Sequence, residues 1–435
     1  MNQVKTRPDW LLSWLSSITR KAAFSVKDIP FSQSKEWAFR DGALGHSTGK
    51  FFRVVGIRYE YPQGVTMYQP LLEQREVGTL GFLIRERDGN REILVQAKIE
   101  PGNVGIVQLS PTCQATESNL LRVHGGKSPP FAEVFSGDDV TILRDSLQSE
   151  QGTRFLGKFN RNVCASFGSE NDLTLDETHR WLPVDTVLSL LHHDFLVNTD
   201  ARSVLVCSPW ETLVGRAPFT RYQSSFAEEL VRSATCDIDD IIFESMLSEI
   251  LTKRSDVKKP SVIPLMDMGG WEITDTGMFP HNRQGFAVHQ IEVQTKYREV
   301  PCWDQPMIRS YSEGEITLVC GRINGIIHFL FRLQVEPGLE SLIELGPTEM
   351  RISGSQKITA GEFSGTVIAQ CRQSEEGGRF FQESNQYQII DIGNTDEASE
   401  GEYWLTLAEI QELVKRGGWL TNEARSALSL LLPWL

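Results

Sequence analysis

An internal duplication is the feature that most constrains the fold of this chain. The triplet Glu100-Pro101-Gly102 recurs as Glu336-Pro337-Gly338, at a spacing of 236 residues. Residues on both sides keep this spacing, and the matching pairs are Gln69 and Gln305, Pro70 and Pro306, Gly78 and Gly314, Gly89 and Gly325, Leu109 and Leu345, Pro111 and Pro347, and Thr112 and Thr348. A fixed period of this kind indicates copies of one structural unit.

The similarity reaches both ends of the two copies with small changes of spacing. The outer pairs are Ile29-Pro30 and Ile263-Pro264, Trp37 and Trp271, His46 and His281, Trp181-Leu182 and Trp404-Leu405, DARS (200–203) and EARS (423–426), and Pro209-Trp210 and Pro433-Trp434. We therefore predict a tandem duplication, with copies at residues 1–210 and 240–435 and a connector at 211–239. A chain of 435 residues is also too long for one ordinary core.

Alternation of apolar and polar residues predicts strands in each copy. The pattern is clear in FFRVVGIRYEY (51–61), GTLGFLIRER (78–87) and EILVQAKIE (92–100). Asp88-Gly89 and Asn324-Gly325 are typical of hairpin turns. Helical spacing follows in PVDTVLSLLHHDF (183–195) and TLAEIQELVKRGGW (406–419). Each copy is thus expected to be a strand-rich sheet closed by a C-terminal helix, an α+β fold.

The strand before Glu-Pro-Gly keeps one face and changes the other. Successive side chains of a strand point to opposite faces. The apolar face is Val95, Ala97 and Ile99 in the first copy and Phe331, Leu333 and Val335 in the second. The polar face changes from Gln96, Lys98 and Glu100 to Arg332, Gln334 and Glu336. The apolar face is therefore kept, whereas the polar face differs between the copies.

Glu-Pro-Gly itself occurs in both copies, and we interpret it mainly as a turn. Proline would fix φ there, and Gly102 would take a positive φ. Residues found only in the first copy are sharper functional candidates, namely Gln96, Lys98, Asn103, Gln114, Asn119 and His124. A lysine with several amides suits an anionic, hydroxyl-rich ligand. Neutral change of a surface face would leave the same difference, so both interpretations stay open.

Composition and missing motifs exclude several classes of protein. The formal charge of −14 argues against nucleic acid or an anionic membrane as the main partner. The sequence contains no run of 18 apolar residues, so no membrane span is predicted. The seven cysteines are scattered along the chain, as expected for free thiols in a reducing cytoplasm. HGGKS (124–128) lacks the first glycine of a phosphate loop, and no G-x-G-x-x-G follows a strand. A cofactor-free enzyme or a binding protein remains.

The first copy resembles the nucleotide-diphosphate-hexose 2,3-dehydratase family. The resemblance rests on QAK-x-EPGN (96–103), QLSPT-x-QAT (108–116), Ser118-Asn119, Arg122, His124 and Gly126, with further matches at HSTGKFF (46–52) and VNTDARSVL (197–205). It covers nearly the whole chain, including the duplication. Leu120 stands where the family has a tyrosine, so no role of that tyrosine carries over. The second copy keeps only EPG and GPT, which suggests a degenerate pocket.

The resemblance implies two tandem Nudix-like domains in one subunit of a cytoplasmic homodimer. The substrate would be dTDP-4-keto-6-deoxyglucose and the product a dTDP-3,4-diketo-2,6-dideoxyhexose for deoxysugar biosynthesis, where an NADPH-dependent 3-ketoreductase would act next. The C4 ketone acidifies the C3 hydrogen, and loss of the C2 hydroxyl gives an enol that becomes the diketone. This chemistry formally requires neither a redox cofactor nor a metal. It requires a base, an acid and donors at the enolate oxygen.

The candidate residues follow from this chemistry. Lys98 and Glu100 are expected at the sugar, and His124 is a further acid or base candidate. Arg122 or Lys127 could hold the diphosphate. Other expected substrate-binding residues are His46, Tyr68, Gln69, Gln96, Asn103, Thr112, Gln114 and Asn119. His46 is a weaker candidate, because its apparent partner His281 would favour a structural role.

The sequence leaves two rival functions. A Nudix-like nucleotide-sugar pyrophosphohydrolase is disfavoured, because the glutamate-rich Nudix helix motif is missing from the sequence. A non-catalytic nucleotide-sugar-binding protein built from two sandwiches would bind the ligand without removing water.

Overall fold

The computed structural model describes residues 8–61, 64–116, 129–137, 140–168, 173–297, 300–351, 363–395 and 398–435. Its first half contains α1 (Asp9–Ala22), β1 (Ser25–Ile29), η1 (Phe31–Gln33), β2 (Trp37–Arg40), β3 (Ala43–His46), β4 (Arg53–Glu60), β5 (Thr66–Glu73), β6 (Gly78–Arg87), β7 (Asn90–Ile99), β8 (Val107–Ser110), β9 (Cys113–Ala115), η2 (Ala132–Ser136), β10 (Val140–Ser149), β11 (Phe155–Leu156), β12 (Phe159–Phe167), β13 (His179–Pro183), α3 (Val184–Leu190), α4 (Thr199–Cys207) and α5 (Trp210–Val214).

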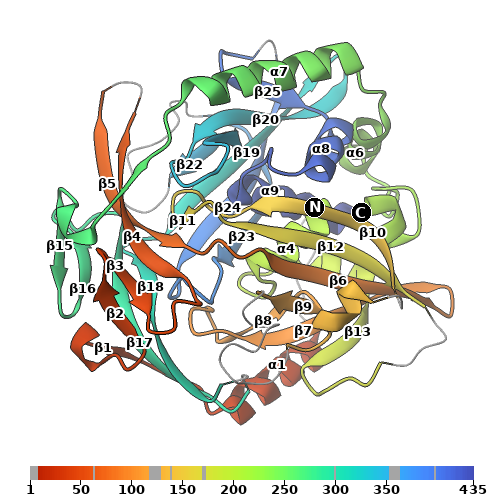
Figure 1. Cartoon of the computed structure of the whole chain (residues 1–435). Coiled ribbons are helices and arrows are strands. Elements are labelled where there is room, and N and C mark those ends of the chain that lie inside the picture. The colour runs from red at the N-terminus through yellow and green to blue at the C-terminus, as the bar shows by residue number, and fades with distance from the viewer. Residues whose placement is uncertain are drawn as a thin grey trace.

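The second half has a similar order of elements, with α6 added and without counterparts of η2 and β11 (Figure 1). It contains α6 (Ser225–Thr235), α7 (Asp240–Asp256), β14 (Ser261–Ile263), η3 (Leu265–Asp267), β15 (Trp271–Thr274), β16 (Gly277–Pro280), β17 (Phe286–Gln294), β18 (Cys302–Ser310), β19 (Gly314–Ile323), β20 (Ile326–Val335), β21 (Ile343–Gly346), β22 (Glu349–Arg351), β23 (Thr366–Ser374), β24 (Ser384–Asn394), β25 (Glu402–Leu405), α8 (Leu407–Arg416), α9 (Asn422–Leu428) and η4 (Ser429–Trp434). The predicted α+β class is confirmed. None of the helices within the described part of the chain is long and apolar enough to cross a membrane.

Each half builds one large and one small sheet. The large sheets have matching strand orders, β10-β12-β6-β7-β13 and β23-β24-β19-β20-β25, each with one parallel pair in the same place. The predicted hairpin turns join β6 to β7 and β19 to β20. Asp88 and Gly89 have φ values of 50° and 74°, and Asn324 and Gly325 have 50° and 77°. Positive φ at both central residues is what a tight hairpin turn needs.

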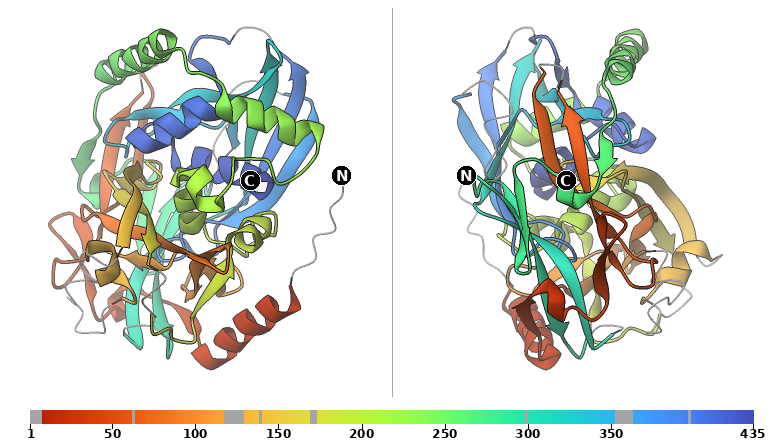
Figure 2. Two further views of the ribbon diagram at one scale, coloured as in Figure 1. Left: turned by 90° about the vertical axis from the view of Figure 1, so that its right-hand side faces the viewer. Right: turned by 60° about the vertical axis from the view of Figure 1, so that its left-hand side comes forward.

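The small sheets exchange their first strands. In the first half, β1 pairs not with its own half but with β17, from Ser25 opposite Gln294 to Ile29 opposite Gln290. In return, β14 of the second half pairs with β4 of the first. The predicted copies therefore interlock. Figure 2 shows α1 and α7, which precede the exchanged strands, at opposite ends of the molecule.

The two Glu-Pro-Gly turns also cross between the halves. The Gly102 amide donates to the Gly377 carbonyl at 2.7 Å, and the Gly338 amide donates to the Gly152 carbonyl at 2.8 Å. The expectation of a positive φ at Gly102 is wrong, because Gly102 is not among the residues with that conformation. Glycine is needed there for close approach, since a Cβ atom would lie 1.6 Å from the Phe380 carbonyl oxygen.

The repeated DARS and EARS motifs join the halves at their centre, where α4 and α9 pack together (Figure 1). Arg202 and Arg425 are both fully buried. The Arg202 guanidinium donates to Ser429 Oγ at 3.0 Å, and that of Arg425 donates to Ser203 Oγ at 2.9 Å. Each arginine thus bonds the other half, and buried guanidinium groups require such partners.

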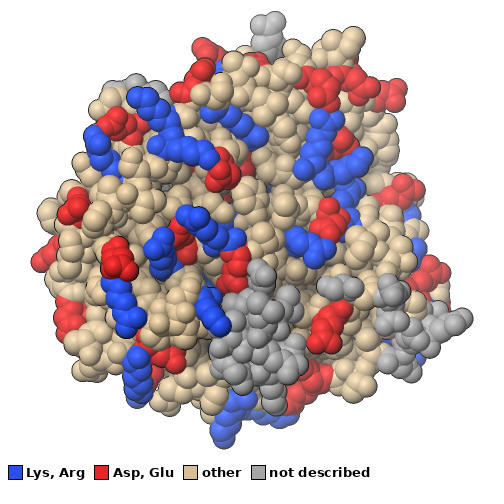
Figure 3. Space-filling model, in the orientation of Figure 1, with Lys and Arg blue, Asp and Glu red and all other residues tan. Residues whose placement is uncertain are grey.

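The predicted strand faces are confirmed in the core. Val95, Ala97 and Ile99 are buried in the main hydrophobic cluster, which includes residues of both halves. On the face of the molecule in Figure 3, basic and acidic side chains are interspersed rather than gathered into one patch. Charged side chains are also concentrated in a cavity beside the end of β7.

Candidate active site

A cavity of about 410 Å³ lies beside the end of β7. Both halves line it. The first half supplies residues from β3, β6, β7, β9, β12 and the start of α4, and the second half supplies β18 and the loop after β23. The charged lining residues are Glu36, Lys98, Glu100, Glu150, Lys158, Asp200, Asp304, Glu376 and Arg379.

Lys98, Glu100 and Gln114 form one wall of the cavity. Lys98 Nζ lies 4.0 Å from Glu100 Oε1 and donates to the Gln114 carbonyl at 3.2 Å. Gln114 Nε2 donates to Glu100 Oε1 at 3.2 Å. Both charged side chains are buried, with 8% of Lys98 and 3% of Glu100 exposed. A buried ion pair of this kind has to be held by further hydrogen bonds, and Gln114 provides them.

The start of α4 is fastened to the same wall. Asn198 caps the helix by accepting from the Ala201 amide at 2.9 Å, and its Nδ2 donates to Gln114 Oε1 at 3.3 Å. The first turn then places Asp200 in the cavity lining, with only 3% of the residue exposed. Burial raises the pKa of Asp200 well above its ordinary value, and the nearby carboxylates of Glu150 and Glu376 add to the rise. Burial therefore favours the protonated form of this carboxyl group.

Glu150 and Lys158 stand on either side of a short loop between β10 and β12. Burial raises the pKa of Glu150, although its carboxylate accepts from Asn160 Nδ2 at 2.6 Å and from Asn422 Nδ2 at 3.1 Å. Burial lowers the pKa of Lys158 to about 8, against the opposing effect of Glu150. Strongly shifted groups gathered in one cavity are a common mark of active sites.

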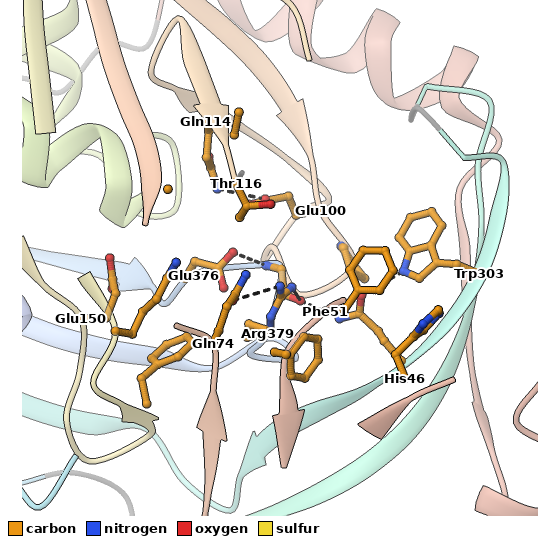
Figure 4. Close-up of a pocket in the computed structure, with 18 of the residues that line it drawn as sticks. His46, Phe51, Gln74, Glu100, Gln114, Thr116, Glu150, Trp303, Glu376 and Arg379 are labelled. Carbon is orange, nitrogen blue, oxygen red and sulfur yellow. Dashed lines mark hydrogen bonds between the residues drawn. The ribbon is translucent and has the colours of Figure 1, made fainter. Parts of the chain in front are cut away.

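Aromatic side chains line the other end of the cavity. The ring centroids of Phe51 and His46 lie 4.5 Å apart. Trp303 Nε1 donates to Gln305 Oε1 at 2.9 Å. Figure 4 shows Arg379 between this aromatic end and the acidic end at Glu150 and Glu376. Such an end can hold a flat base by stacking.

The structure brings four of the thirteen sequence-predicted site residues to this cavity: His46, Lys98, Glu100 and Gln114. Four others, Asn119, Arg122, His124 and Lys127, lie outside the described residues, as does Leu120. The remaining five, Tyr68, Gln69, Gln96, Asn103 and Thr112, do not line it.

Those five residues have structural contacts. The Thr112 hydroxyl accepts from the Leu83 amide at 3.0 Å, and Thr348 does the same for Val319 at 2.9 Å in the other half. Asn103 Nδ2 donates to the Ile106 carbonyl at 3.2 Å. The other partners are Thr153 O for Gln69, Ser110 Oγ for Gln96 and Trp271 Nε1 for the Tyr68 carbonyl. These contacts favour a scaffold role.

The pairing of His46 with His281 is wrong by one position. Trp37 pairs with His46 across β2 and β3, and the equivalent strand pair is Trp271 with Pro280. Proline thus stands where the first half has His46. His281 is therefore not the counterpart of His46, and His46 joins the residues that only the first half possesses. It contacts Thr48 Oγ1 at 2.8 Å and Glu36 Oε2 at 3.3 Å.

Sequence reasoning missed Glu150, Lys158, Asp200, Glu376 and Arg379. A signal was present, because residues 149–160, SEQGTRFLGKFN, repeat as 374–385, SEEGGRFFQESN. Their spacing of 225 residues differs from that of the Glu-Pro-Gly triplets. Asp200 lay within the repeated DARS motif but received no role.

A corresponding group of residues around the second Glu-Pro-Gly turn keeps three of the acidic residues and loses both lysines. Glu336, Glu375 and Glu423 replace Glu100, Glu150 and Asp200, whereas Gln334 and Glu383 replace Lys98 and Lys158. We refer to Glu336, Glu375, Glu383 and Glu423 as the second carboxyl cluster. All four are buried. Burial raises the pKa of Glu375 to about 8 and that of Glu423 to about 7. Among the described residues, no group of three or more His, Cys, Asp or Glu side chains is arranged to hold a metal ion.

This cluster predicts a stability that falls as pH rises. Between the ordinary value of 4.5 and about 8, the Glu375 carboxyl binds more protons in the folded than in the unfolded chain. Stability must therefore decrease with pH across this range. Glu375→Gln resembles the protonated form, so its melting temperature should fall less between pH 5 and pH 8 than that of the wild type. Circular dichroism measures this difference. The control is Glu340→Gln, at an exposed side chain, and an equal fall in wild type and Glu375→Gln would contradict the prediction.

Comparison with known proteins identifies the family. Residues 9–208 and 245–431 match the NDP-hexose 2,3-dehydratase family. The chain is 34% identical to a dTDP-4-dehydro-6-deoxy-alpha-D-glucopyranose 2,3-dehydratase of Saccharopolyspora spinosa, over 96% of this chain and 90% of that protein. Proteins of the same description from Amycolatopsis orientalis and Streptomyces violaceoruber are 31% and 32% identical, over 98% and 96% of this chain and 91% and 95% of theirs.

The match falls on both halves and stops close to the ends of the predicted copies. The class is that of sugar-nucleotide dehydratases. The chain belongs to the NDP-hexose 2,3-dehydratase family, as the resemblance indicated.

Proposed function

We propose that this protein removes water from C2 and C3 of dTDP-4-keto-6-deoxyglucose, the sugar that the names of its relatives describe as a 4-dehydro-6-deoxy-glucopyranose. The observation that carries the proposal is a buried lysine–glutamate pair, Lys98 and Glu100, in one cavity with Asp200, a buried carboxyl group whose pKa is raised. An elimination needs a base, an acid and a stabilised enolate, and these three groups can supply them.

Each group has a separate part in the proposed reaction. The Glu100 carboxylate takes the proton from C3, and the electrons of the C3–H bond form a C3=C4 double bond with negative charge on the C4 oxygen. Lys98 holds that oxygen by charge and hydrogen bonding. The enolate then reforms the C4 carbonyl and a C2=C3 double bond, while the C2 hydroxyl leaves as water with a proton from Asp200. The resulting C3 enol tautomerises to the diketone by moving its hydroxyl proton to C2.

The wider setting of the protein is part of the same proposal. The two copies, 1–210 and 240–435 with 211–239 between them, would be Nudix-like domains of a homodimeric, cytoplasmic enzyme. The labile diketone would pass to an NADPH-dependent 3-ketoreductase. Support for the duplication comes from the matching strand orders of the large sheets. Lys98 and Lys158 of the first half correspond to Gln334 and Glu383 in the second, which favours a single reacting pocket beside the first Glu-Pro-Gly turn.

The test is incubation with dTDP-4-keto-6-deoxyglucose, with and without a chelator, followed by mass spectrometry. We expect loss of one water, and a coupled 3-ketoreductase should trap the product. Release of dTMP and a sugar phosphate would instead identify a pyrophosphohydrolase. Binding of an unchanged sugar nucleotide would identify a non-catalytic binding protein.

A further inference from the structure

Arg379 belongs to the second half of the chain but lines the cavity of the first. Its loop is fixed there by backbone hydrogen bonds. Gly102 donates to the Gly377 carbonyl at 2.7 Å, Gln382 donates to the Gly102 carbonyl at 2.8 Å, and Ile308 donates to the Arg379 carbonyl at 2.8 Å. The turn that carries Gly102 follows Glu100 directly. The position of Arg379 is therefore tied to the proposed base.

The guanidinium of Arg379 is oriented by contacts within the cavity. Its central carbon lies 4.1 Å from the centre of the Phe52 ring. One terminal nitrogen donates to the Gly378 carbonyl at 3.0 Å, and the other donates to Gln74 Oε1 at 3.3 Å. Stacking on a ring and hydrogen bonds to a carbonyl and an amide oxygen fix the orientation of this guanidinium in the cavity.

A series of contacts places this guanidinium in the middle of the cavity. From the aromatic end, Trp303 donates to Gln305, and Gln305 Nε2 donates at 2.6 Å to the Gly378 carbonyl that Arg379 also contacts. On the other side, Arg379 acts electrostatically on Glu376 and on Lys158. Figure 4 shows the same order, from Trp303 and Phe51 through Arg379 to Glu376 and Glu150.

A sugar nucleotide has the same order of chemical groups: a flat base, an anionic diphosphate and a hydroxylated hexose. We infer that Arg379 binds the diphosphate, so that the second half of the chain supplies the phosphate-binding cation of the site in the first half. This inference rests on the proposed function for the identity of the ligand. A bidentate guanidinium matches phosphate geometry better than other side chains.

The second half contains a matched control. Arg154 occupies the equivalent position and lies 4.2 Å from the ring of Phe286, which is the counterpart of Phe52. It contacts Glu383 at 3.8 Å, at the place where the first half has Lys158. Arg154→Gln thus removes a similar ring contact without touching the proposed site.

The experiment measures dTDP binding by titration calorimetry and KM for the sugar nucleotide. Arg379→Gln should weaken dTDP binding and raise KM by about 10- to 100-fold, as expected for a charged hydrogen bond to phosphate. Its kcat should change less, and Arg379→Lys should recover part of the loss. Arg154→Gln should leave KM within about twofold. Unchanged binding of dTDP by folded Arg379→Gln would overturn the inference.

A second measurement uses the wild-type chain and so does not depend on folding of a variant. Phenylglyoxal modifies arginine side chains, and peptide mass spectrometry locates the sites. We expect dTDP to protect Arg379 and not Arg154, and equal modification of Arg379 with and without dTDP would overturn the inference. Protection of Arg379 in an enzyme that removes no water would support the inference while contradicting the proposed function.

Discussion

Replacing Lys98 by methionine should lower turnover of the sugar nucleotide by about 10²- to 10⁴-fold. The lysine is buried, 4.0 Å from Glu100, and is the cation proposed to hold the enolate oxygen. Methionine preserves the length of the side chain but provides neither charge nor a donor. The loss should appear mainly in kcat, and dTDP should still bind because Lys98 lies at the sugar end of the proposed site. Steady-state kinetics and calorimetry measure the two effects separately.

The duplication provides the control for this variant. Gln334 stands at the equivalent position of β20, with the same pairing to the neighbouring strand. Gln334→Met should change turnover by no more than about twofold. Full turnover in Lys98→Met would remove Lys98 from the reaction. An equal loss in both variants would show that the change disturbs the interlocked fold instead of the chemistry.

The fold was predictable wherever local pattern determines structure. Alternation of apolar and polar residues predicted β4, β6 and β7, and turn residues predicted both hairpins. Identical residues at a fixed spacing indicated the duplication. The exchange of β1 and β14 was not predictable, because the sequence of a short strand does not indicate which strand it pairs with. This exchange is one reason why residues of the second half reach a cavity of the first.

The site was predictable only where the two copies align by simple spacing. Lys98 and Gln114 could be identified as candidates because the nearby Glu-Pro-Gly triplet fixes the alignment of the two copies. Glu150 and Arg379 did not, because their segment repeats at a different spacing, and a buried glutamate looks in sequence like an exposed one. His46 was assigned the wrong counterpart because a histidine, His281, lies one position after the equivalent residue, Pro280.

Replacing Glu100 by glutamine should also lower turnover by about 10²- to 10⁴-fold, because the amide cannot accept the C3 proton. Glutamine keeps the shape of the side chain beside Gln114. The control is Glu336→Gln in the second half, where the carboxylate accepts from the Gly152 amide at 2.7 Å. That variant should melt at a different temperature from the wild type yet keep turnover within a few-fold.

Deuterium exchange can separate the base from the acid in this proposal. In heavy water, reversible proton removal exchanges the C3 hydrogen of the substrate before any water is lost. Glu100→Gln should abolish this exchange, whereas Asp200→Asn should block loss of water and leave the exchange in place, because only the leaving hydroxyl needs the Asp200 proton. Mass spectrometry of recovered substrate distinguishes the two variants. Exchange at the wild-type rate in Glu100→Gln would mean that another group is the base, and Lys98, 4.0 Å away, would then be the next candidate.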